Sequence, residues 1–547
     1  MFKFLILLLI WVSYSHQQSL LDGLIKLIQE GEDQISAEPP DMSASRMLKE
    51  YDFIVVGAGT AGCAVANRLS ENPNWTVLLV EAGRPENFIM DMPILANYLQ
   101  FTETNWRYQT EPNGNACLGF DEQRCNWPRG KVVAGYHGKN GYLSVSYAPY
   151  RTKIADAIVN ASLQYGLPYV DYNGPTQRWC KREFKQSLFA SDQQSAKLAF
   201  NQVFHDPKSQ QVKGIEMVKN GQTYFIKVKK EVISSAGAIN SPQLLMLSGV
   251  GPKKHLQKLG IPVISNLRVG YNLMDHIGMG GLTFLINETV SLKTERLINN
   301  KDLGDYLNNH HGPLSIPGGC EVLVFNDFDH PGDSDGYPDI ELLYQGGSIV
   351  SDIVLRKDFG ITDGIYNKVF KPIENTDSFM VFPILLRPKS RGRLMLKSAD
   401  YKHKPYIFPN YFADPKDMET IIKGVKLVME IAAKPALQSL GTRLHNIPIP
   451  QCADRGFGSD AYFECMARHF TFTIYHQSGT CKMGPSADKK AVVDSRLRVY
   501  GIKGLRVIDA SIMPEIPAAH TNSPTFMIAE KGSDMIKEDW GFNTNFV

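Results

Sequence analysis

The N-terminal part of the chain contains the stretch Tyr51-Asp-Phe-Ile-Val-Val-Gly-Ala-Gly-Thr-Ala-Gly62. A short apolar run with β-branched residues leads directly into three glycines with GxGxxG spacing, and the helix-compatible segment 63–69 follows. A second apolar run, 75–80, ends in Glu81. This order of strand, glycine turn, helix, strand and acid predicts a βαβ unit that binds a dinucleotide.

Each glycine of the turn has a separate expected role. Gly57 allows the tight turn, Gly59 lets the backbone approach a pyrophosphate, and Gly62 lets the helix pack close to the strand. The N-terminus of the helix presents free N–H groups to the phosphates. Glu81 lies 24 residues after Gly57, where a carboxylate accepts hydrogen bonds from ribose hydroxyls. A GxGxxG pattern alone also occurs in ordinary turns, but the two strands and the acid favour a dinucleotide site.

The composition is that of a soluble globular protein with two or more domains. The chain has 547 residues, of which 43% are apolar and 21% charged, and this length exceeds a single ordinary core. The net charge is +2 and no long basic run occurs. The sequence therefore gives no indication of a nucleic-acid partner.

Residues 1–15 have the features of a signal peptide. Lys3 precedes the apolar run 4–12, and small residues follow near a plausible cleavage site after Ser15. Nine apolar residues are too few to span a bilayer, and we find no other membrane-spanning run. We therefore expect a secreted, extracellular protein whose mature form begins with an extension, residues 16–46.

Eight cysteines in an exported chain suggest disulfide bonds. Cys117 and Cys125 flank one loop and Cys452 and Cys465 flank another, so both pairs are expected to form short-range bridges. Cys63 is expected to be a small buried residue of the first helix. No Cys/His spacing resembles a zinc site, and we expect no metal. Three sequons predict a glycoprotein, at Asn74, Asn160 and Asn287.

The rest of the chain indicates a second domain and a return to the first. Between 275 and 470, strand-like runs such as 282–286 and 340–344 alternate with Gly/Pro-rich loops, and apolar spacing predicts a helix over 418–433. The last 70 or so residues again show a strand-turn-helix pattern. We expect a nucleotide-binding domain over 47–274, a substrate domain over 275–470, and a C-terminal segment, 471–540, that rejoins the first domain.

Two histidines near the C-terminus are candidates for acid–base chemistry. His476 and His520 lie among Gly, Ser, Thr and Pro residues, in loops of the kind that often carry function. They bracket the turn 509–511, and His520 precedes a helix predicted over 525–536. Neutral imidazole near pH 7 is suited to removing a hydroxyl proton. An isolated loop histidine is more often structural, but this arrangement favours a catalytic role.

Seven segments make the chain resemble the glucose-methanol-choline (GMC) oxidoreductase family, most nearly its insect glucose dehydrogenase (FAD, quinone)-like group. The resemblance extends over nearly everything after about residue 47, and the segment 237–251 is highly specific. The segments are Tyr51–Gly62, Glu81–Gly83, Cys125–Lys131, Gly237–Gly251, Val269–His276, Tyr475–Gly484 and Asp509–Lys531.

The resemblance implies an α/β fold, with a Rossmann-type FAD-binding domain and a mixed α+β substrate domain containing an antiparallel sheet. It also implies an enzyme that oxidises a CH–OH group of an alcohol or sugar and passes the electrons to a quinone or another acceptor. His476 matches the histidine that takes the hydroxyl proton while hydride leaves for flavin N5. His520 matches the position that holds and polarises the substrate oxygen.

The same resemblance implies a set of FAD contacts. Glu81 is expected at the adenosine ribose, Asp509 and Ala510 at the ribityl-diphosphate, and Asn522 and Thr525 near the pyrimidine edge of the flavin. The helix that begins there would stabilise negative charge on the reduced flavin. The full expected set is Gly57, Ala58, Gly59, Thr60, Ala61, Gly62, Glu81, Ala82, Gly237, Asp509, Ala510, Asn522 and Thr525.

Two stretches depart from the family pattern. The first family signature continues into a Gly/Ser-rich loop that packs over the flavin ring, but here 129–135 runs directly into 136–145, so a block is missing near 135/136. The stretch 178–203 lacks the usual helix and strand. A misplacement of about 1 Å can lower a rate roughly 100-fold, and the loss of a wall of the flavin site is a larger change. We therefore expect weak flavin retention and low activity.

Two alternatives to an active FAD enzyme stay open at this point. One is a catalytically impaired or non-catalytic secreted GMC-like protein, or a truncated isoform, and the missing flavin wall favours it. The other is an NAD-dependent dehydrogenase with the same glycine fingerprint, against which the C-terminal His/Asn pattern argues.

Overall fold

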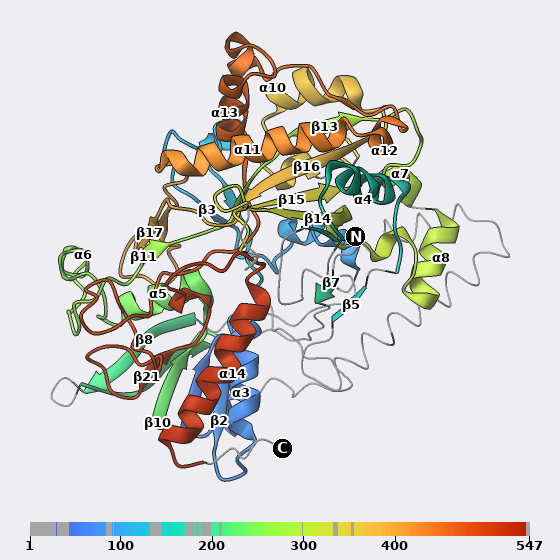
Figure 1. Cartoon of the computed structure of the whole chain (residues 1–547). Helices are drawn as coiled ribbons and strands as arrows, with labels where there is room; N and C mark the ends of the chain where they lie inside the picture. The colour runs from blue at the N-terminus through green and yellow to red at the C-terminus, as the bar shows by residue number, and fades with distance from the viewer. Residues whose placement is uncertain are drawn as a thin grey trace.

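The computed structural model contains two large sheets with helices packed against them (Figure 1). It describes residues 29, 43–83, 90, 92–131, 145–147, 149–169, 179–181, 185–187, 199–206, 210–297, 299–331, 337–351 and 355–542. The expected signal peptide, most of the expected extension and the 135/136 junction lie outside the described residues. No helix of the described part is long and apolar enough to cross a membrane.

The first sheet has the strand order β2-β1-β10-β9-β8, with β21 paired to β10. Its strands β1, β2, β10 and β21 run parallel, whereas β8 and β9 form an antiparallel extension. The bounds are β1 (Glu50–Val56), β2 (Val77–Val80), β8 (Ala199–Asp206), β9 (Gln211–Lys219), β10 (Gln222–Ser234) and β21 (Leu505–Val507).

The centre of this sheet follows from the opening stretch of the sequence. Residues 51–56 of β1 are all buried, as expected for a continuous apolar run in a parallel strand covered on both faces. Helix α3 (Thr60–Ser70) begins directly after the glycine turn and buries mainly small residues. The predicted βαβ unit is therefore present, with α3 starting three residues earlier than the segment 63–69.

The C-terminal segment returns to the first sheet. Strand β21 pairs with β10, and helix α14 (Asn522–Asp539) lies beside α3 (Figure 1). Buried Arg506 of β21 donates to Glu231 of β10 at 2.5 and 2.9 Å and to Asp539 at 2.6 Å. Loss of one partner of such a buried pair costs about 3–5 kcal/mol. These contacts hold the C-terminal end of α14 against β10 and β21 of the first sheet.

The second sheet is antiparallel throughout and carries the order β19-β13-β16-β15-β14-β6, with β12 joining β16 to β20. Every residue of β16 is buried, because helices cover one face and the site described below lies against the sheet. The bounds are β6 (Trp179–Lys181), β12 (Ile277–Met279), β13 (Leu282–Leu285), β14 (Cys320–Asn326), β15 (Ile340–Gln345), β16 (Ser378–Leu385), β19 (Arg443–Leu444) and β20 (Thr471–Thr473).

Helix α11 (Pro415–Ala432) lies across this sheet and packs on β15 and β16 (Figure 1). Asp414 caps its N-terminus by accepting a hydrogen bond from the Lys416 amide at 2.9 Å, and proline occupies the first helical position. Its buried residues recur every three or four positions, which is the pattern that predicted this helix. Helix α4 (Lys153–Tyr165) packs beside it.

Shorter elements complete the described part. A three-stranded sheet contains β11 (Tyr271–Leu273), β17 (Gly392–Met395) and β18 (Tyr406–Phe408), and two pairs are β3 (Tyr108–Gln109) with β4 (Asn126–Trp127) and β5 (Val145–Tyr147) with β7 (Lys185–Ser187). The further helices are α5 (Gly237–Leu247), α6 (Lys253–Lys258), α7 (Thr294–Leu297), α8 (Asn300–Asn309), α9 (Leu355–Asp358), α10 (Asp363–Ile365), α12 (Pro435–Gln438) and α13 (Asp460–His469).

The predicted fold class, a Rossmann-type unit plus a domain with an antiparallel sheet, is confirmed. The domain boundaries stay predictions, and β6 and α4 pack against the second sheet although both precede residue 275. Residues 199–206 form β8, whereas the sequence pattern gave no regular structure before 204. Antiparallel pairing with β9, the next strand along the chain, forms this strand although its own residues show no strand pattern.

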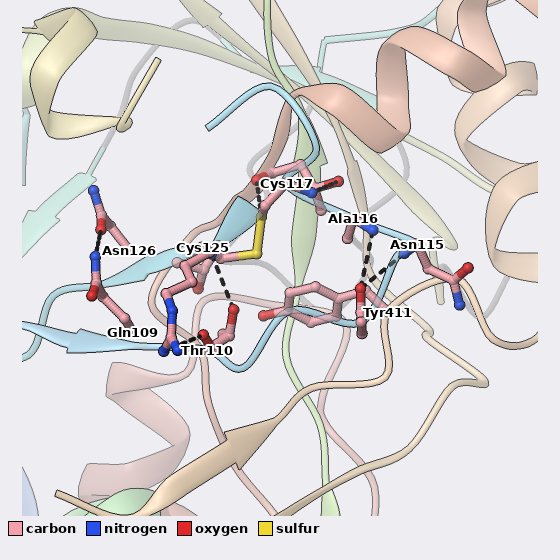
Figure 2. The surroundings of a disulfide bond; sticks show 12 residues. Gln109, Thr110, Asn115, Ala116, Cys117, Cys125, Asn126 and Tyr411 are labelled. Carbon is pink, nitrogen blue, oxygen red and sulfur yellow. Dashed lines mark hydrogen bonds between the residues drawn. A yellow bond between two sulfur atoms is a disulfide. The ribbon is translucent and has the colours of Figure 1, made fainter. Parts of the chain in front are cut away.

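Both predicted disulfides are present. Cys117 bonds to Cys125 and Cys452 to Cys465, with Cα atoms 5.4 and 5.7 Å apart. Cys63 is buried, as expected, and its thiol donates a hydrogen bond to the Ala58 carbonyl at 3.1 Å. Next to the first bridge, the Cys125 amide donates a hydrogen bond to the Thr110 hydroxyl at 3.0 Å. Tyr411 is among the residues around this bridge (Figure 2).

Candidate active site

The glycine turn after β1 leaves open space where a pyrophosphate would lie. Gly57 has φ +100°, and a Cβ on Gly62 would lie 1.7 Å from the Gly57 carbonyl oxygen, so neither position accepts a side chain. A Cβ on Gly59 would meet no atom within 4 Å. Gly59 also caps α3 without a side chain, so the first N–H groups of the helix face this space.

Glu81 closes the other side of this space at the end of β2. Its carboxylate accepts hydrogen bonds from the amides of Ala58 at 2.7 Å and Gly83 at 2.6 Å. Ala82 follows Glu81 directly in the chain, and Ala61 is buried in α3. The predicted ribose-binding acid thus lies directly against the glycine turn.

The N-termini of α3 and α14 meet through one side-chain hydrogen bond. The Thr60 hydroxyl donates to Oδ1 of Asn522 at 2.8 Å. Nδ2 of Asn522 is buried and has no hydrogen-bond partner in the described part of the chain. The Thr525 hydroxyl donates back to the Thr521 carbonyl at 2.7 Å. Two helix N-termini and an unpaired amide donor therefore face one region, which favours a ligand with negative charge and acceptor atoms.

Asp509 joins the first residue of α5 to the C-terminal segment. Its Oδ2 accepts hydrogen bonds from the Gly237 amide at 2.9 Å and from the Ser241 hydroxyl at 2.5 Å. The Ala510 carbonyl accepts from the Gly479 amide at 3.1 Å. Together with the glycine turn, Glu81 and Asn522, these groups form a polar cradle of the kind that the ADP half of FAD requires, so the residues present fit this cofactor.

The two predicted catalytic histidines lie together. The rings of His476 and His520 have centroids 4.8 Å apart and are nearly perpendicular, at 85°. His476 is only 7% exposed. The residue before it, Tyr475, has φ +68°, a left-handed conformation that is uncommon outside glycine and is found at functional sites.

A third histidine fixes the protonation pattern of His476. Nε2 of His276 lies 2.9 Å from the Leu386 carbonyl oxygen, and Nδ1 of His276 lies 3.0 Å from Nδ1 of His476. A carbonyl can only accept, so the His276 proton is on Nε2 and its Nδ1 is an acceptor. His476 must then carry its proton on Nδ1, which leaves a lone pair on Nε2.

The lone pair of His476 is available for a substrate proton. Among the described residues, none forms a hydrogen bond to His476 Nε2. Burial, with the nearby charge of His520, lowers the pKa of His476 well below its usual value. Burial likewise lowers the pKa of His276 to about 3. Both rings are therefore neutral at physiological pH, as this tautomer assignment requires.

Asp275 holds the backbone of His476 from the residue next to His276. Its carboxylate accepts hydrogen bonds from the Tyr411 hydroxyl at 2.6 Å, the Thr473 hydroxyl at 2.7 Å and the His476 amide at 3.1 Å. Burial raises the pKa of Asp275 to about 7, against these hydrogen bonds and the charge of Arg129. The pair Asp275–His276 thus fixes both the backbone and the ring of His476.

His520 has the opposite electrostatic environment. Its Nε2 lies 3.2 Å from Oε1 of Glu341, a fully buried residue of β15, while the His520 side chain keeps 38% exposure. Burial acts to lower the pKa of His520, but the Glu341 carboxylate outweighs burial and raises the pKa above its usual value. Oε2 of Glu341 has no hydrogen-bond partner among the described residues. The site therefore pairs a neutral histidine with one that favours its charged form.

Sequence reasoning identified the two histidines that face each other but not the residues that tune them. Asp275 and His276 belong to the family-like segment 269–276, from which no role is predicted for either residue. Glu341 stands inside the apolar run 340–344, and a carboxylate in a buried strand is a signal for a functional group. The cross-chain contacts of all three could not be read from local patterns.

The one group of possible metal ligands found in the described part lies elsewhere. Cys452, Cys465 and His469 have ligand atoms within 4.8 Å of one another, but the two cysteines form a disulfide, and Nδ1 of His469 donates to the Cys465 carbonyl at 2.8 Å. The disulfide and this hydrogen bond therefore account for the short distances within the group.

Similarity to known proteins agrees with this site. Family models described as GMC oxidoreductase match residues 165–278 and 388–529. Glucose dehydrogenase [FAD, quinone] of Drosophila melanogaster is 35% identical over 565 positions, which cover 90% of this chain and 87% of that protein. Mitochondrial choline dehydrogenase of Mus musculus is 32% identical, with 89% of each chain covered.

Solved structures agree on the fold. A formate oxidase of Aspergillus oryzae has a TM-score of 0.72 at 24% identity, over 90% of this chain and 98% of that chain. The alignment with the fly enzyme is longer than the 547 residues of this chain, so that relative contains residues without a counterpart here. The chain belongs to the GMC oxidoreductase family and is an FAD-dependent oxidoreductase that acts on CH–OH groups.

Proposed function

We propose that the chain oxidises an alcohol or sugar with His476 as the proton acceptor and His520 as the group that holds the substrate oxygen. The hydrogen-bond chain from the Leu386 carbonyl through His276 to His476 carries this proposal, because it leaves only Nε2 of His476 free to accept a proton. FAD, when bound, supplies the acceptor for the hydride that leaves the carbinol carbon.

The two histidines divide the work on the substrate hydroxyl. His476 is neutral at physiological pH and takes the hydroxyl proton on Nε2. His520 is held toward its imidazolium form by Glu341, so it stabilises the negative charge that develops on the substrate oxygen. The ring centroids lie 4.8 Å apart, so a general base and an electrostatic stabiliser are close enough to act on the same substrate hydroxyl.

Asp275 and His276 act on the base without contacting the substrate. Asp275 fixes the backbone of His476 and His276 fixes its tautomer, so the acceptor nitrogen is positioned before the substrate arrives. Such preorganisation avoids reorientation during the reaction.

The substrate is proposed to be a small polyhydroxy compound or alcohol, and the electron acceptor a quinone. The basis is the similarity to glucose dehydrogenase [FAD, quinone] and alcohol dehydrogenase [acceptor]. FAD-loaded protein would be assayed with glucose, choline and simple alcohols, using a soluble quinone or oxygen as acceptor. Quinone reduction without peroxide formation supports a dehydrogenase, whereas peroxide formation identifies an oxidase.

The variant His476→Ala tests the assignment of the base. We expect loss of turnover by about 10²–10⁴-fold, with bound FAD and melting temperature unchanged. Turnover that survives this substitution would show that another group takes the proton. His403→Ala is a matched control, because His403 is an exposed histidine outside the site.

A second candidate is a catalytically impaired or non-catalytic member of the family. The shorter chain favours it, since the relatives contain residues that have no counterpart here. Flavin absorbance of the purified protein distinguishes the two candidates: stoichiometric FAD with turnover rules out the second, and absence of both after incubation with excess FAD rules out the first.

We also propose that the protein is exported and glycosylated. The two disulfides suit an oxidising compartment, and the sequon residues Asn74, Asn160 and Asn287 are all exposed. Expression in insect cells should yield protein in the medium whose mass falls on glycosidase treatment. Retention inside the cells without glycan would contradict this proposal.

A further inference from the structure

The three-stranded sheet of β11, β17 and β18 carries an unusual concentration of positive charge. Residues 387–404, which include β17 and the loop to β18, contain seven Lys/Arg residues and a single carboxylate, Asp400. The whole chain has a net charge of only +2. Figure 1 shows β11 and β17 at the edge of the molecule, away from α4 and α8.

One face of this sheet alternates cations and aromatic rings. Arg268 lies over the ring of Tyr271 at 5.0 Å, and Tyr271 is paired across the strands with Arg393. Arg393 is paired with Phe408 and lies over its ring at 5.3 Å. The row continues along β18, where Phe408 lies 6.2 Å from the ring of Tyr406.

Three further lysines next to this row also lie over aromatic rings. Lys397 lies over the Tyr406 ring at 5.7 Å and Lys402 over the Tyr401 ring at 5.8 Å. Lys404 lies over Tyr108 of β3 at 5.9 Å, in a segment that joins β18 through a hydrogen bond from the Glu111 amide to the Ile407 carbonyl at 2.7 Å.

Lys131 completes the surface. It lies over the Trp106 ring at 5.0 Å, and that ring stacks on Tyr108. The cationic face is therefore defined by six side chains: Lys131, Arg268, Arg393, Lys397, Lys402 and Lys404.

These six cations have no ion-pair partner in the described part of the chain, although most other arginines there are paired. Lys131 is half-buried and the other five are exposed. The opposite side of the sheet, with Leu394 and Ile407, is buried, so the strands that carry these cations are anchored to the core. Counting Asp400, the face carries +5, which leaves a net charge of −3 for the rest of the molecule.

We propose that the cationic face binds a linear, sulfated polysaccharide. Neighbouring antiparallel strands lie about 4.8 Å apart, so the cations follow one another in a row that spans the sheet and continues onto the segment 106–108. A chain molecule with sulfate groups at regular intervals can neutralise this row with few other contacts, releasing bound counterions as it does so.

The same observations argue against other anionic partners. Single-stranded nucleic acid stacks its bases on aromatic faces, but here the ring faces carry cations. Stable attachment to a membrane surface takes a second element besides a polybasic patch, such as apolar side chains that enter the interface, whereas this face presents charges over its rings. A specific protein interface needs an apolar core, which the face does not offer. The preferred partner is therefore recognised mainly by its charge and its extended shape.

Binding of the full chain to a heparin-derived oligosaccharide would be measured by fluorescence anisotropy at two salt concentrations. We expect binding that weakens steeply with salt and no binding to a neutral dextran of the same length. The variant Arg393→Glu/Lys397→Glu should bind at least about tenfold more weakly. A milder variant, Arg393→Gln/Lys397→Gln, gives the same test if charge reversal prevents folding.

Lys368→Glu/Lys371→Glu is the matched control, because it reverses two exposed lysines on another part of the surface. It should bind within about twofold of the parent if the face itself is the site. The proposal is overturned if the parent does not bind at low salt, or if the control loses as much affinity as the face variant. Tighter binding to duplex DNA or to phosphatidylserine vesicles than to heparin would also overturn it.

Discussion

Replacement of His276 tests whether the tautomer of His476 controls the reaction. His276→Leu keeps an apolar branch where Nδ1 stood but removes the acceptor of the His476 Nδ1 proton. His276→Asn keeps an acceptor, because the amide oxygen of asparagine is attached to Cγ at the same position as Nδ1 of histidine. Neither variant reaches the Leu386 carbonyl, so the two differ mainly in what they offer to His476.

The size of the effect follows from the burial of the site. His276 is fully buried and His476 nearly so, and a buried donor without an acceptor costs about 1–3 kcal/mol. The productive tautomer should become less populated by this amount, which corresponds to a fall of about 5- to 150-fold in kcat/KM for His276→Leu. A catalytic histidine in the wrong tautomer can lose up to about 10⁴ in kcat. His276→Asn should stay within about fivefold of the parent.

The assay measures kcat/KM for the oxidation of an alcohol substrate, at saturating FAD and with a dye as electron acceptor, over a range of pH. Flavin content and melting temperature of each variant control for loss of the fold. The reasoning is refuted if His276→Leu remains within about twofold of the parent, or if the asparagine variant falls as far as the leucine variant while both retain FAD.

Three further perturbations address the other parts of the site. Glu341→Gln should move the alkaline limb of kcat/KM to lower pH. The Glu341 carboxylate raises the pKa of His520, and the charged form of His520 is lost as the pH rises through that pKa. An alkaline limb that does not move would exclude this pairing. The same pair stabilises the parent at low pH and less as pH rises through the raised pKa, so the difference in melting temperature between parent and variant should shrink toward alkaline pH. Gly59→Ala should fold normally but retain less FAD, because its Cβ enters the open space beside the turn. Gly62→Ala should fail to fold, because its Cβ would lie 1.7 Å from a backbone oxygen. Equal melting temperatures for the two variants would contradict this packing. The parent itself should release FAD on gel filtration if a flavin wall is missing, and FAD that stays stoichiometric through repeated passes would show that the remaining residues suffice.

The dinucleotide unit could be predicted because its signals are local. The turn at Gly57 needs a positive φ, Gly62 needs the absence of a side chain, and β1 is buried on both faces, so each requirement appears directly in the residue type. Helix α11 was predictable for a similar reason, since its buried residues recur with helical spacing.

The tuning of the two histidines could not be predicted because it depends on pairing between distant segments. His276 reaches His476 across 200 positions, and Glu341 reaches His520 across 179. The register of β15 decides which side of the sheet the Glu341 side chain occupies, since a shift by one residue would turn it away. The cationic face could be predicted only in part: four of its cations lie between 393 and 404, but Lys131 and Arg268 join them only through the fold.

The parts of the site that handle the proton and the parts that enclose the flavin ring come from different segments, and this separation has a consequence. The hydrogen-bond chain uses the segments around 275, 341, 386, 476 and 520, all in the described part of the chain. None of its members lies within 130 positions of the 135/136 junction along the sequence. A missing wall should therefore weaken FAD binding without altering the tautomer of His476 or the pairing of His520. At saturating FAD, the ratio of activity between the parent and His276→Leu should then be set by the histidine network alone, whatever the absolute rate.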